Sequence, residues 1–129
     1  MQVKYPAAIS PGRLRPDLPC SQGIPPTWFA GQITGSEGYT EAVATGWYAA
    51  WNMAQTLRHG VADPLPEESC IASLMNRLVE ENENFQPMNF NFGLLPHKME
   101  MKKKNKKEIL AEQAQKAVLA WIDKRKSQF

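Results

Sequence analysis

The stretch that decides the fold class covers residues 27–38 and reads Thr27-Trp28-Phe29-Ala30-Gly31-Gln32-Ile33-Thr34-Gly35-Ser36-Glu37-Gly38. Four apolar, β-prone residues are followed by three closely spaced glycines. This order predicts a strand, a glycine-rich turn and a helix, with Ser36 as the N-cap and Glu37 at the positive end of the helix dipole. Backbone N–H groups in such a turn can bind an anion, commonly a phosphate. A plain connecting loop is the alternative interpretation of the glycines alone.

Three helices are predicted after the turn. The first should cover about 38–58 and end at a Gly60 cap, with one apolar stripe at helical spacing made of Val43, Trp47, Ala50, Ala54 and Leu57. A strip of small residues (Ala42, Gly46, Ala49, with Met53) lies beside it and would allow close approach to a sheet or a flat ligand.

The second helix is expected to start near Pro66, with Glu67 and Glu68 in its first turn and an apolar stripe made of Ile71, Leu74, Met75 and Leu78. The third should span about 104–124, with inward-facing residues Ile109, Leu110, Ala114, Ala117, Val118, Trp121 and Ile122. Three helices and one good strand make a poor sheet. Residues 1–26 are predicted to be irregular because prolines interrupt every possible helix.

Composition narrows the class of protein. The chain is 43% hydrophobic and 22% charged with a formal net charge of +2, which is typical of a folded protein and too small a charge to imply nucleic-acid binding by itself. No apolar run approaches the roughly 18 residues that a membrane span needs, and no signal-peptide pattern is present. We therefore expect a cytoplasmic protein without a membrane partner.

Two cysteines, Cys20 and Cys70, lie far apart and have no nearby Cys or His at metal-ligand spacing. No metal site is expected. A pair of free cytosolic thiols is the favoured interpretation, with a disulfide or a reactive thiol as alternatives. Neither cysteine has an adjacent base, so neither is predicted to be a nucleophile.

A second unusual stretch, residues 85–96, reads Phe85-Gln86-Pro87-Met88-Asn89-Phe90-Asn91-Phe92-Gly93-Leu94-Leu95-Pro96. Its prolines block a helix, and the alternation of Phe and Asn predicts an extended segment with the phenyl rings on one side. We expect the rings to pack against protein rather than to stack on nucleic-acid bases, which is the alternative.

These two stretches carry a resemblance to known flavoproteins. Residues 29–39, followed by Glu41-Ala42 and Gly46, resemble the FAD-binding turn shared by two tRNA-modifying families. One family methylates uracil C5 in tRNA, and the other, of the glucose-inhibited-division type, builds carboxymethylaminomethyl groups on wobble uridines. The string at 85–96 resembles that of the methylenetetrahydrofolate–tRNA-(uracil-5-)-methyltransferases, which favours the first family.

The resemblance implies the C-terminal, helix-rich part of an α/β, Rossmann-like FAD-binding fold. The implied domains are an irregular segment at 1–26, the end of the FAD-binding domain at 27–60 and a helical region at 61–129. It implies the cofactor-binding residues Gly31, Gln32, Ile33, Thr34, Gly35, Gly38 and Tyr39. FAD would be the cofactor, methylenetetrahydrofolate and NAD(P)H the co-substrates, and a T-loop uridine of tRNA the methylated group.

The family's G-x-G-x-x-G fingerprint and catalytic cysteines have no counterpart here, so no catalytic residue is predicted in this chain. We expect an N-terminal FAD-binding portion as partner and no activity of the chain alone. The alternatives are an autonomous tRNA-binding or partner-subunit module and a fragment of the wobble-uridine class. A lysine cluster is the tentative tRNA contact, against a solvated face as the simpler interpretation: Lys102, Lys103, Lys104, Lys106 and Lys107.

Overall fold

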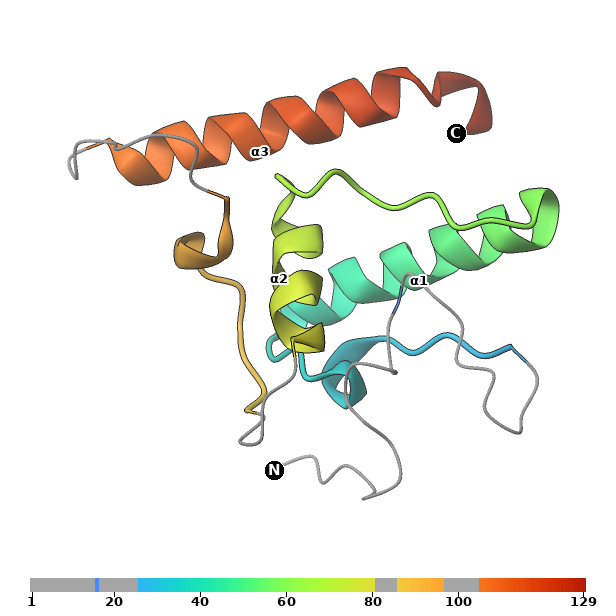
Figure 1. Cartoon of the computed structure of the whole chain (residues 1–129), viewed down its shortest axis with the longest axis horizontal. Coiled ribbons are helices and arrows are strands. Elements are labelled where there is room, and N and C mark those ends of the chain that lie inside the picture. Colours follow the sequence, from blue (N-terminus) through green and yellow to red (C-terminus); the bar gives the residue numbers. More distant parts are fainter. Residues whose placement is uncertain (1–15, 17–25, 81–85, 97–104) are drawn as a thin grey trace.

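The structure, a computed structural model, describes residue 16 and residues 26–80, 86–96 and 105–129. Within these ranges it contains three α-helices, α1 (Tyr39–His59), α2 (Cys70–Val79) and α3 (Lys106–Asp123). Three short 3₁₀ turns accompany them: η2 (Gly31–Thr34), η3 (Phe92–Leu94) and η4 (Lys126–Gln128). Figure 1 shows α1 and α3 running lengthwise, while α2 runs crosswise below α3 beside the N-terminal end of α1. Predictions that concern residues 1–15, Cys20, Phe85 and Lys102–Lys104 lie outside the described residues.

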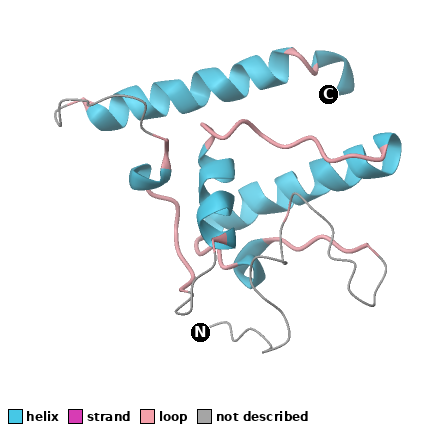
Figure 2. Ribbon diagram, viewed as in Figure 1, coloured by secondary structure: helices cyan, strands magenta, loops and turns pink. Residues whose placement is uncertain are grey.

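The predicted strand at 27–30 does not form in the described part of the chain, which is helical or irregular throughout (Figure 2). Isolated bridge positions occur instead: Thr27, Ser36 and Met88 are each bridge residues, and Ser36 pairs with Met88 in parallel. A strand needs consecutive paired residues, but within 27–30 only Thr27 is a bridge residue, and the 3₁₀ turn η2 follows at once. The helix-rich character is confirmed, while the Rossmann-like arrangement stays a prediction.

Two of the three helices start and end close to their predicted bounds. α1 ends at His59 and is capped by Gly60, whose φ of 77° is left-handed and whose N–H donates to Thr56 O at 2.9 Å. α3 differs from its predicted bounds by no more than two residues at either end. The start of α2 was predicted wrongly: it begins at Cys70, where the Ser69 side chain accepts from Ala72 N at 3.2 Å, so Glu67 and Glu68 precede the helix.

The predicted apolar stripe of α1 exists, but it lies on the exposed side of the helix. Val43 is 74% exposed and Leu57 75%. The buried side carries mostly polar residues (Thr45, Tyr48, Ala49, Asn52 and Gln55). These side chains are buried because they hydrogen-bond neighbouring segments, as the contacts below show. The apolar periodicity of α1, which in most helices marks the buried side, here coincides with the exposed side.

One hydrophobic cluster joins the three helices. Its buried members are Tyr48 from α1, Leu65 from the 60–69 segment, Trp121 from α3, and Ala72, Leu74, Met75 and Leu78 from α2. A smaller cluster of Leu95, Leu110 and Ala114 lies beside it. The stripe predicted for α2 and the inward positions Leu110, Ala114 and Trp121 of α3 are thus confirmed, whereas Ile109 is exposed.

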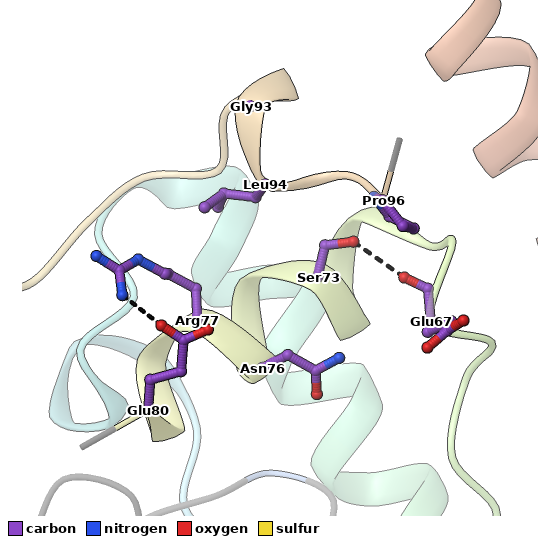
Figure 3. Close-up of a pocket in the computed structure, with 8 residues that line it drawn as sticks. All are labelled: Glu67, Ser73, Asn76, Arg77, Glu80, Gly93, Leu94 and Pro96. Carbon is purple, nitrogen blue, oxygen red and sulfur yellow. Dashed lines mark hydrogen bonds and ion pairs between the residues drawn. The ribbon is translucent and has the colours of Figure 1, made fainter. Parts of the chain in front are cut away.

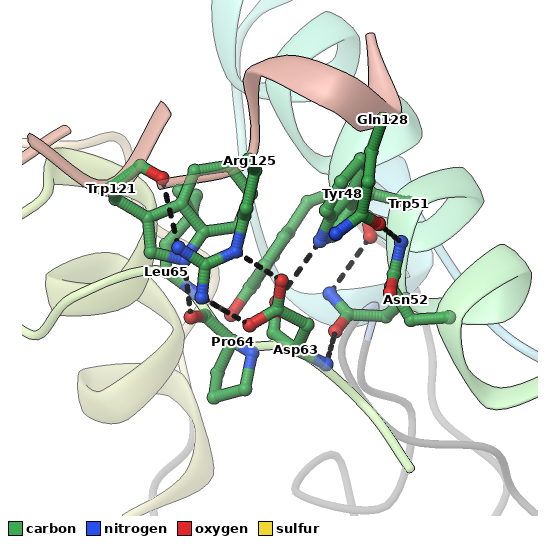
Figure 4. A network of polar contacts seen from close by, with 10 residues as sticks. Tyr48, Trp51, Asn52, Asp63, Pro64, Leu65, Trp121, Arg125 and Gln128 are labelled. Atoms are coloured by element: carbon green, nitrogen blue, oxygen red, sulfur yellow. Dashed lines mark hydrogen bonds and ion pairs between the residues drawn. The ribbon is translucent and has the colours of Figure 1, made fainter. Parts of the chain in front are cut away.

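Polar contacts hold the 60–69 segment between α1 and α3 (Figure 4). From α1, the Tyr48 hydroxyl accepts from Leu65 N at 3.1 Å and the Asn52 amide oxygen accepts from Asp63 N at 3.0 Å. From α3, Trp121 Nε1 donates to the carbonyl oxygen of Pro64 at 3.0 Å. No helix in the described residues is long and apolar enough to cross a membrane.

Candidate functional site

The glycine turn is held closed by hydroxyl groups. Thr34 Oγ1 and Ser36 Oγ both donate to the carbonyl oxygen of Gly31, at 2.7 and 3.0 Å, while Gly31 N–H donates to Thr45 Oγ1 of α1 at 2.9 Å. Gly35 N–H closes the turn onto Gln32 O at 2.9 Å, with a φ of 93° at Gly35. Ser36 therefore does not cap α1 as predicted, because its buried hydroxyl is used within the turn. Gly38 occupies the N-cap position instead.

The predicted cofactor-binding residues divide into two groups. Gln32, Ile33 and Tyr39 are exposed, whereas Thr34 and Gly35 are buried and maintain the turn. Gly31 has a φ of 79°, and a Cβ added there would have no atom within 4 Å. The space beside the Gly31 backbone is therefore open, and the exposed Gln32 side chain lies next to it in the sequence. Such a surface is compatible with a flat ring that lies against the turn.

The structure brings the 85–96 string against the glycine turn. Met88 N–H donates to Gly35 O at 2.8 Å, and Glu37 N–H donates to Met88 O at 2.9 Å. Asn89 Nδ2 donates to the Glu37 carbonyl at 2.8 Å. Two stretches about fifty residues apart in the sequence thus form one unit at the N-terminal end of α1.

Glu41 is a residue of this unit that we did not predict as a site residue. Its Oε1 accepts the backbone N–H of Phe90 at 3.0 Å and so ties the string to the first turn of α1. Gly38 is confined between the same groups: a Cβ there would overlap the Glu41 carboxylate and lie 2.8 Å from Asn89 Nδ2, and its φ is 108°. An acidic residue in the first turn after an N-cap glycine is common, so the sequence alone does not distinguish this contact.

The phenyl rings of the string pack on protein, as expected. Phe90 and Phe92 form a T-shaped pair with ring centroids 5.7 Å apart, and both lie against the cluster of Leu95, Leu110 and Ala114. Asn91, between them, has an extended backbone with φ −144° and ψ 157°. The two rings thus lie on one side, as predicted, but the predicted extended segment is interrupted after Asn91, because Phe92–Leu94 form the 3₁₀ turn η3.

A polar cleft of about 420 Å³ lies where the end of the string meets α2 (Figure 3). Its lining residues are Glu67, Ser73, Asn76, Arg77, Glu80, Gly93, Leu94 and Pro96. The Ser73 hydroxyl donates to Glu67 O at 3.0 Å, and Arg77 pairs with Glu80 at 2.5 Å. No lining residue is a His, Cys or Lys that could activate a nucleophile, so the cleft has no catalytic arrangement of that kind.

The remaining candidates give no catalytic site among the described residues. Cys70 is a free thiol, and burial raises its pKa above the usual value although a backbone hydrogen bond opposes this, so it is a weak nucleophile at neutral pH. The described part of the chain holds no group of three His, Cys, Asp or Glu suited to a metal ion. Lys106 and Lys107 begin α3, on a different element from the glycine turn.

Comparison with known proteins gives two kinds of match. Residues 2–60 match the family model described as "Glucose inhibited division protein A". That match covers the glycine turn and α1 but stops before the 85–96 string. It agrees with a turn that is shared between the two flavoprotein families.

The curated relatives match further along the chain, and each carries the name methylenetetrahydrofolate–tRNA-(uracil-5-)-methyltransferase TrmFO. The protein of Natranaerobius thermophilus is 41% identical over 78% of this chain and 24% of its own length. That of Carboxydothermus hydrogenoformans is 42% identical over 88% and 26%, and that of Pelobacter propionicus 35% identical over 95% and 26%. The chain thus spans about a quarter of the length of these relatives. Over most of its residues it is therefore a TrmFO-like chain.

Proposed function

We propose that the chain forms the C-terminal part of a flavoprotein that methylates C5 of the T-loop uridine in tRNA. Methylenetetrahydrofolate would donate the carbon, and FAD, reduced by NAD(P)H, would supply the reducing equivalents. The names of the relatives support the folate, the tRNA and the uracil. In this proposal the chain positions FAD and is inactive alone, because it contributes no catalytic residue.

The observation that carries the proposal is the backbone pairing of Met88 with Gly35 and Glu37. It unites the turn that resembles a flavin-binding turn with the string that resembles the uracil methyltransferases. Within this unit the backbone at Gly31 and the Gln32 amide are the groups that would hold the cofactor, and the positive end of α1 would lie close to it. When bound, FAD supplies redox chemistry, while the protein contributes position and electrostatics.

The wobble-uridine class is the second candidate, favoured by the family match at residues 2–60. It leaves the 85–96 string unexplained. The relative from Pelobacter propionicus covers 95% of this chain, including residues beyond that match. The uracil methyltransferase assignment therefore accounts for more of the sequence.

The test is reconstitution. The chain would be co-expressed with the part of the Natranaerobius thermophilus relative that it does not match, and the purified assembly assayed for bound FAD by absorbance and for 5-methyluridine in tRNA by mass spectrometry. We expect both from the assembly and neither from the chain alone. An assembly without FAD, or one that modifies the wobble uridine instead, would contradict the proposal.

Gly31→Ala provides the residue-level test in the same assembly. Gly31 (φ 79°) and Gly60 (φ 77°) both face open space, so an added Cβ strains the backbone equally at the two positions. We expect Gly31→Ala to weaken FAD binding about tenfold, because the methyl group would separate the cofactor from the backbone. Gly60→Ala, at the far end of α1, should leave FAD binding unchanged.

A further inference from the structure

The polar cleft between α2 and η3 contains hydrogen-bonding groups that the fold does not use (Figure 3). Its volume of about 420 Å³ lies within the range of about 300–1,000 Å³ that is usual for small-molecule sites. The backbone carbonyl of Glu67 accepts from Ser73 at 3.0 Å, but within the described part of the chain the Glu67 carboxylate and the Asn76 amide have no hydrogen-bond partner. Both side chains line the cleft and are free to bind a ligand.

The charges of the cleft determine which ligand chemistry it can accept. Arg77 and Glu80 neutralise each other in an ion pair at 2.5 Å, so the Glu67 carboxylate is the unbalanced charge among the lining residues. A carboxylate disfavours a phosphate or a second carboxylate beside it, and it accepts two parallel hydrogen bonds from adjacent N–H groups. An amide such as that of Asn76 can donate to a carbonyl oxygen. Together the two side chains suit a ligand edge on which two neighbouring N–H donors lie beside a carbonyl.

Leu94 and Pro96 give the cleft an apolar side. Figure 3 shows both on one side of the cleft, across from Glu67 and Asn76. Both are half-buried, and Gly93 next to them adds no side chain to the space. A flat ring could pack against these apolar side chains while its polar edge reaches the carboxylate and the amide. A peptide arginine would satisfy the carboxylate but would leave the amide donor and the apolar side unused.

We infer that the cleft binds a flat bicyclic ring through an aminopyrimidinone edge, in which a ring N–H and an amino group lie beside a carbonyl. Glu67 accepts from the N–H and the amino group, and Asn76 donates to the carbonyl oxygen. Guanine and pterins both carry this edge. The inference rests on the proposed function only for the source of the ring, which is a guanine of tRNA or the pterin of methylenetetrahydrofolate.

The position of the cleft agrees with either source. Its η3 side belongs to the 85–96 string, and Met88 of the same string pairs with Gly35 and Glu37 beside the glycine turn. A ring bound in the cleft therefore lies on the same unit as the turn that resembles a flavin-binding turn.

The edge is tested on the purified chain by NMR titration with guanosine and with inosine, which lacks only the amino group. We expect inosine to bind about tenfold more weakly, because Glu67 loses one of its two donors. Glu67→Gln should weaken guanosine binding about tenfold and remove the preference over inosine, since a neutral amide accepts less strongly and presents an N–H to the donors of the ligand. Asn76→Asp, which replaces the donor by an acceptor, should also weaken guanosine binding about tenfold. Glu112→Gln, the same change as at Glu67 but at an exposed glutamate of α3, should have no effect.

Folic acid and the co-expressed assembly distinguish the two sources of the ring. Folic acid carries a pterin and should compete with guanosine for the cleft of the purified chain. In the assembly, Glu67→Gln should raise the KM for one substrate and not the other. That substrate is tRNA if the ring is a guanine, and methylenetetrahydrofolate if the ring is the pterin.

The inference is overturned if guanosine and folic acid both fail to bind, if inosine or arginine methyl ester binds as tightly as guanosine, or if Glu67→Gln and Glu112→Gln behave alike. An assembly in which Glu67→Gln changes neither KM overturns the assignment of the ring to a substrate. The urea midpoint of each variant should equal that of the wild type, which separates a lost ligand contact from lost folding. Binding to the chain alone does not need the assembly, so an assembly that fails to methylate tRNA contradicts the proposed function and leaves the ligand of the cleft standing.

Discussion

At the scale of single residues, the glycine turn and the 85–96 string depend on a few side chains that contact backbone groups. Glu41 accepts from Phe90 N, Asn89 donates to Glu37 O, and Gly38 leaves room for both. The residue types in this unit were all visible in the sequence. Their partners were not, because the two stretches are distant in the chain and only folding brings them together.

Glu41→Ala should lower the free energy of unfolding by about 1–2 kcal/mol, because it leaves the Phe90 N–H without its charged acceptor. Glu41→Gln keeps an oxygen at the same place and should lose less than half as much. Urea unfolding measures both values, and hydrogen exchange at the Phe90 amide reports the bond itself. Equal losses in the two variants would show that the carboxyl group's acceptor role is unimportant.

At the scale of elements, the C-terminal end of α3 is fastened to the 60–69 segment. The Arg125 guanidinium makes a two-pronged ion pair with Asp63, donates to Trp121 O at 2.8 Å and lies 4.1 Å from the centroid of the Trp121 ring. Asp63 O in turn accepts from Trp51 Nε1 at 3.1 Å. α1 and α3 are thus joined through a segment without regular secondary structure.

Arg125→Ala should lower the free energy of unfolding by about 1–3 kcal/mol, because the partly buried Asp63 carboxylate would lose its ion-pair partner. Lys126→Ala is the matched control. It removes an exposed ion pair with Asp123 at 3.0 Å and should cost no more than about 0.5 kcal/mol. Chemical denaturation measures both, and a Lys126 effect as large as that of Arg125 would contradict this account.

At the scale of the whole molecule, one core unites α1, the 60–69 segment, α2 and α3. Trp121 lies in it at 7% exposure, with its ring 5.2 Å from that of Trp51 between centroids. Because the core draws on elements from residue 48 to residue 121, the described elements should unfold together.

Trp121→Ala should therefore destabilise the fold by about 3–5 kcal/mol through the cavity that it leaves. Leu119→Ala changes an exposed side chain that belongs to neither hydrophobic cluster, so it should cost no more than about 0.5 kcal/mol. Circular dichroism during urea unfolding gives both values. Separate transitions for α1 and α3 in the wild-type chain would contradict a shared core.

The sequence by itself determined the number of long helices, the bounds of α1 and α3, and the resemblance to TrmFO. Capping glycines, prolines and apolar spacing are local features, so they placed α1 and α3 within two residues, and the motif strings are read directly from the chain. Tertiary structure alone decided which side of α1 is buried, that Ser36 serves the turn rather than the helix, and that Met88 pairs with Gly35. These outcomes depend on hydrogen bonds between distant segments. A buried backbone group requires a polar partner, and that requirement outweighed the apolar periodicity of α1.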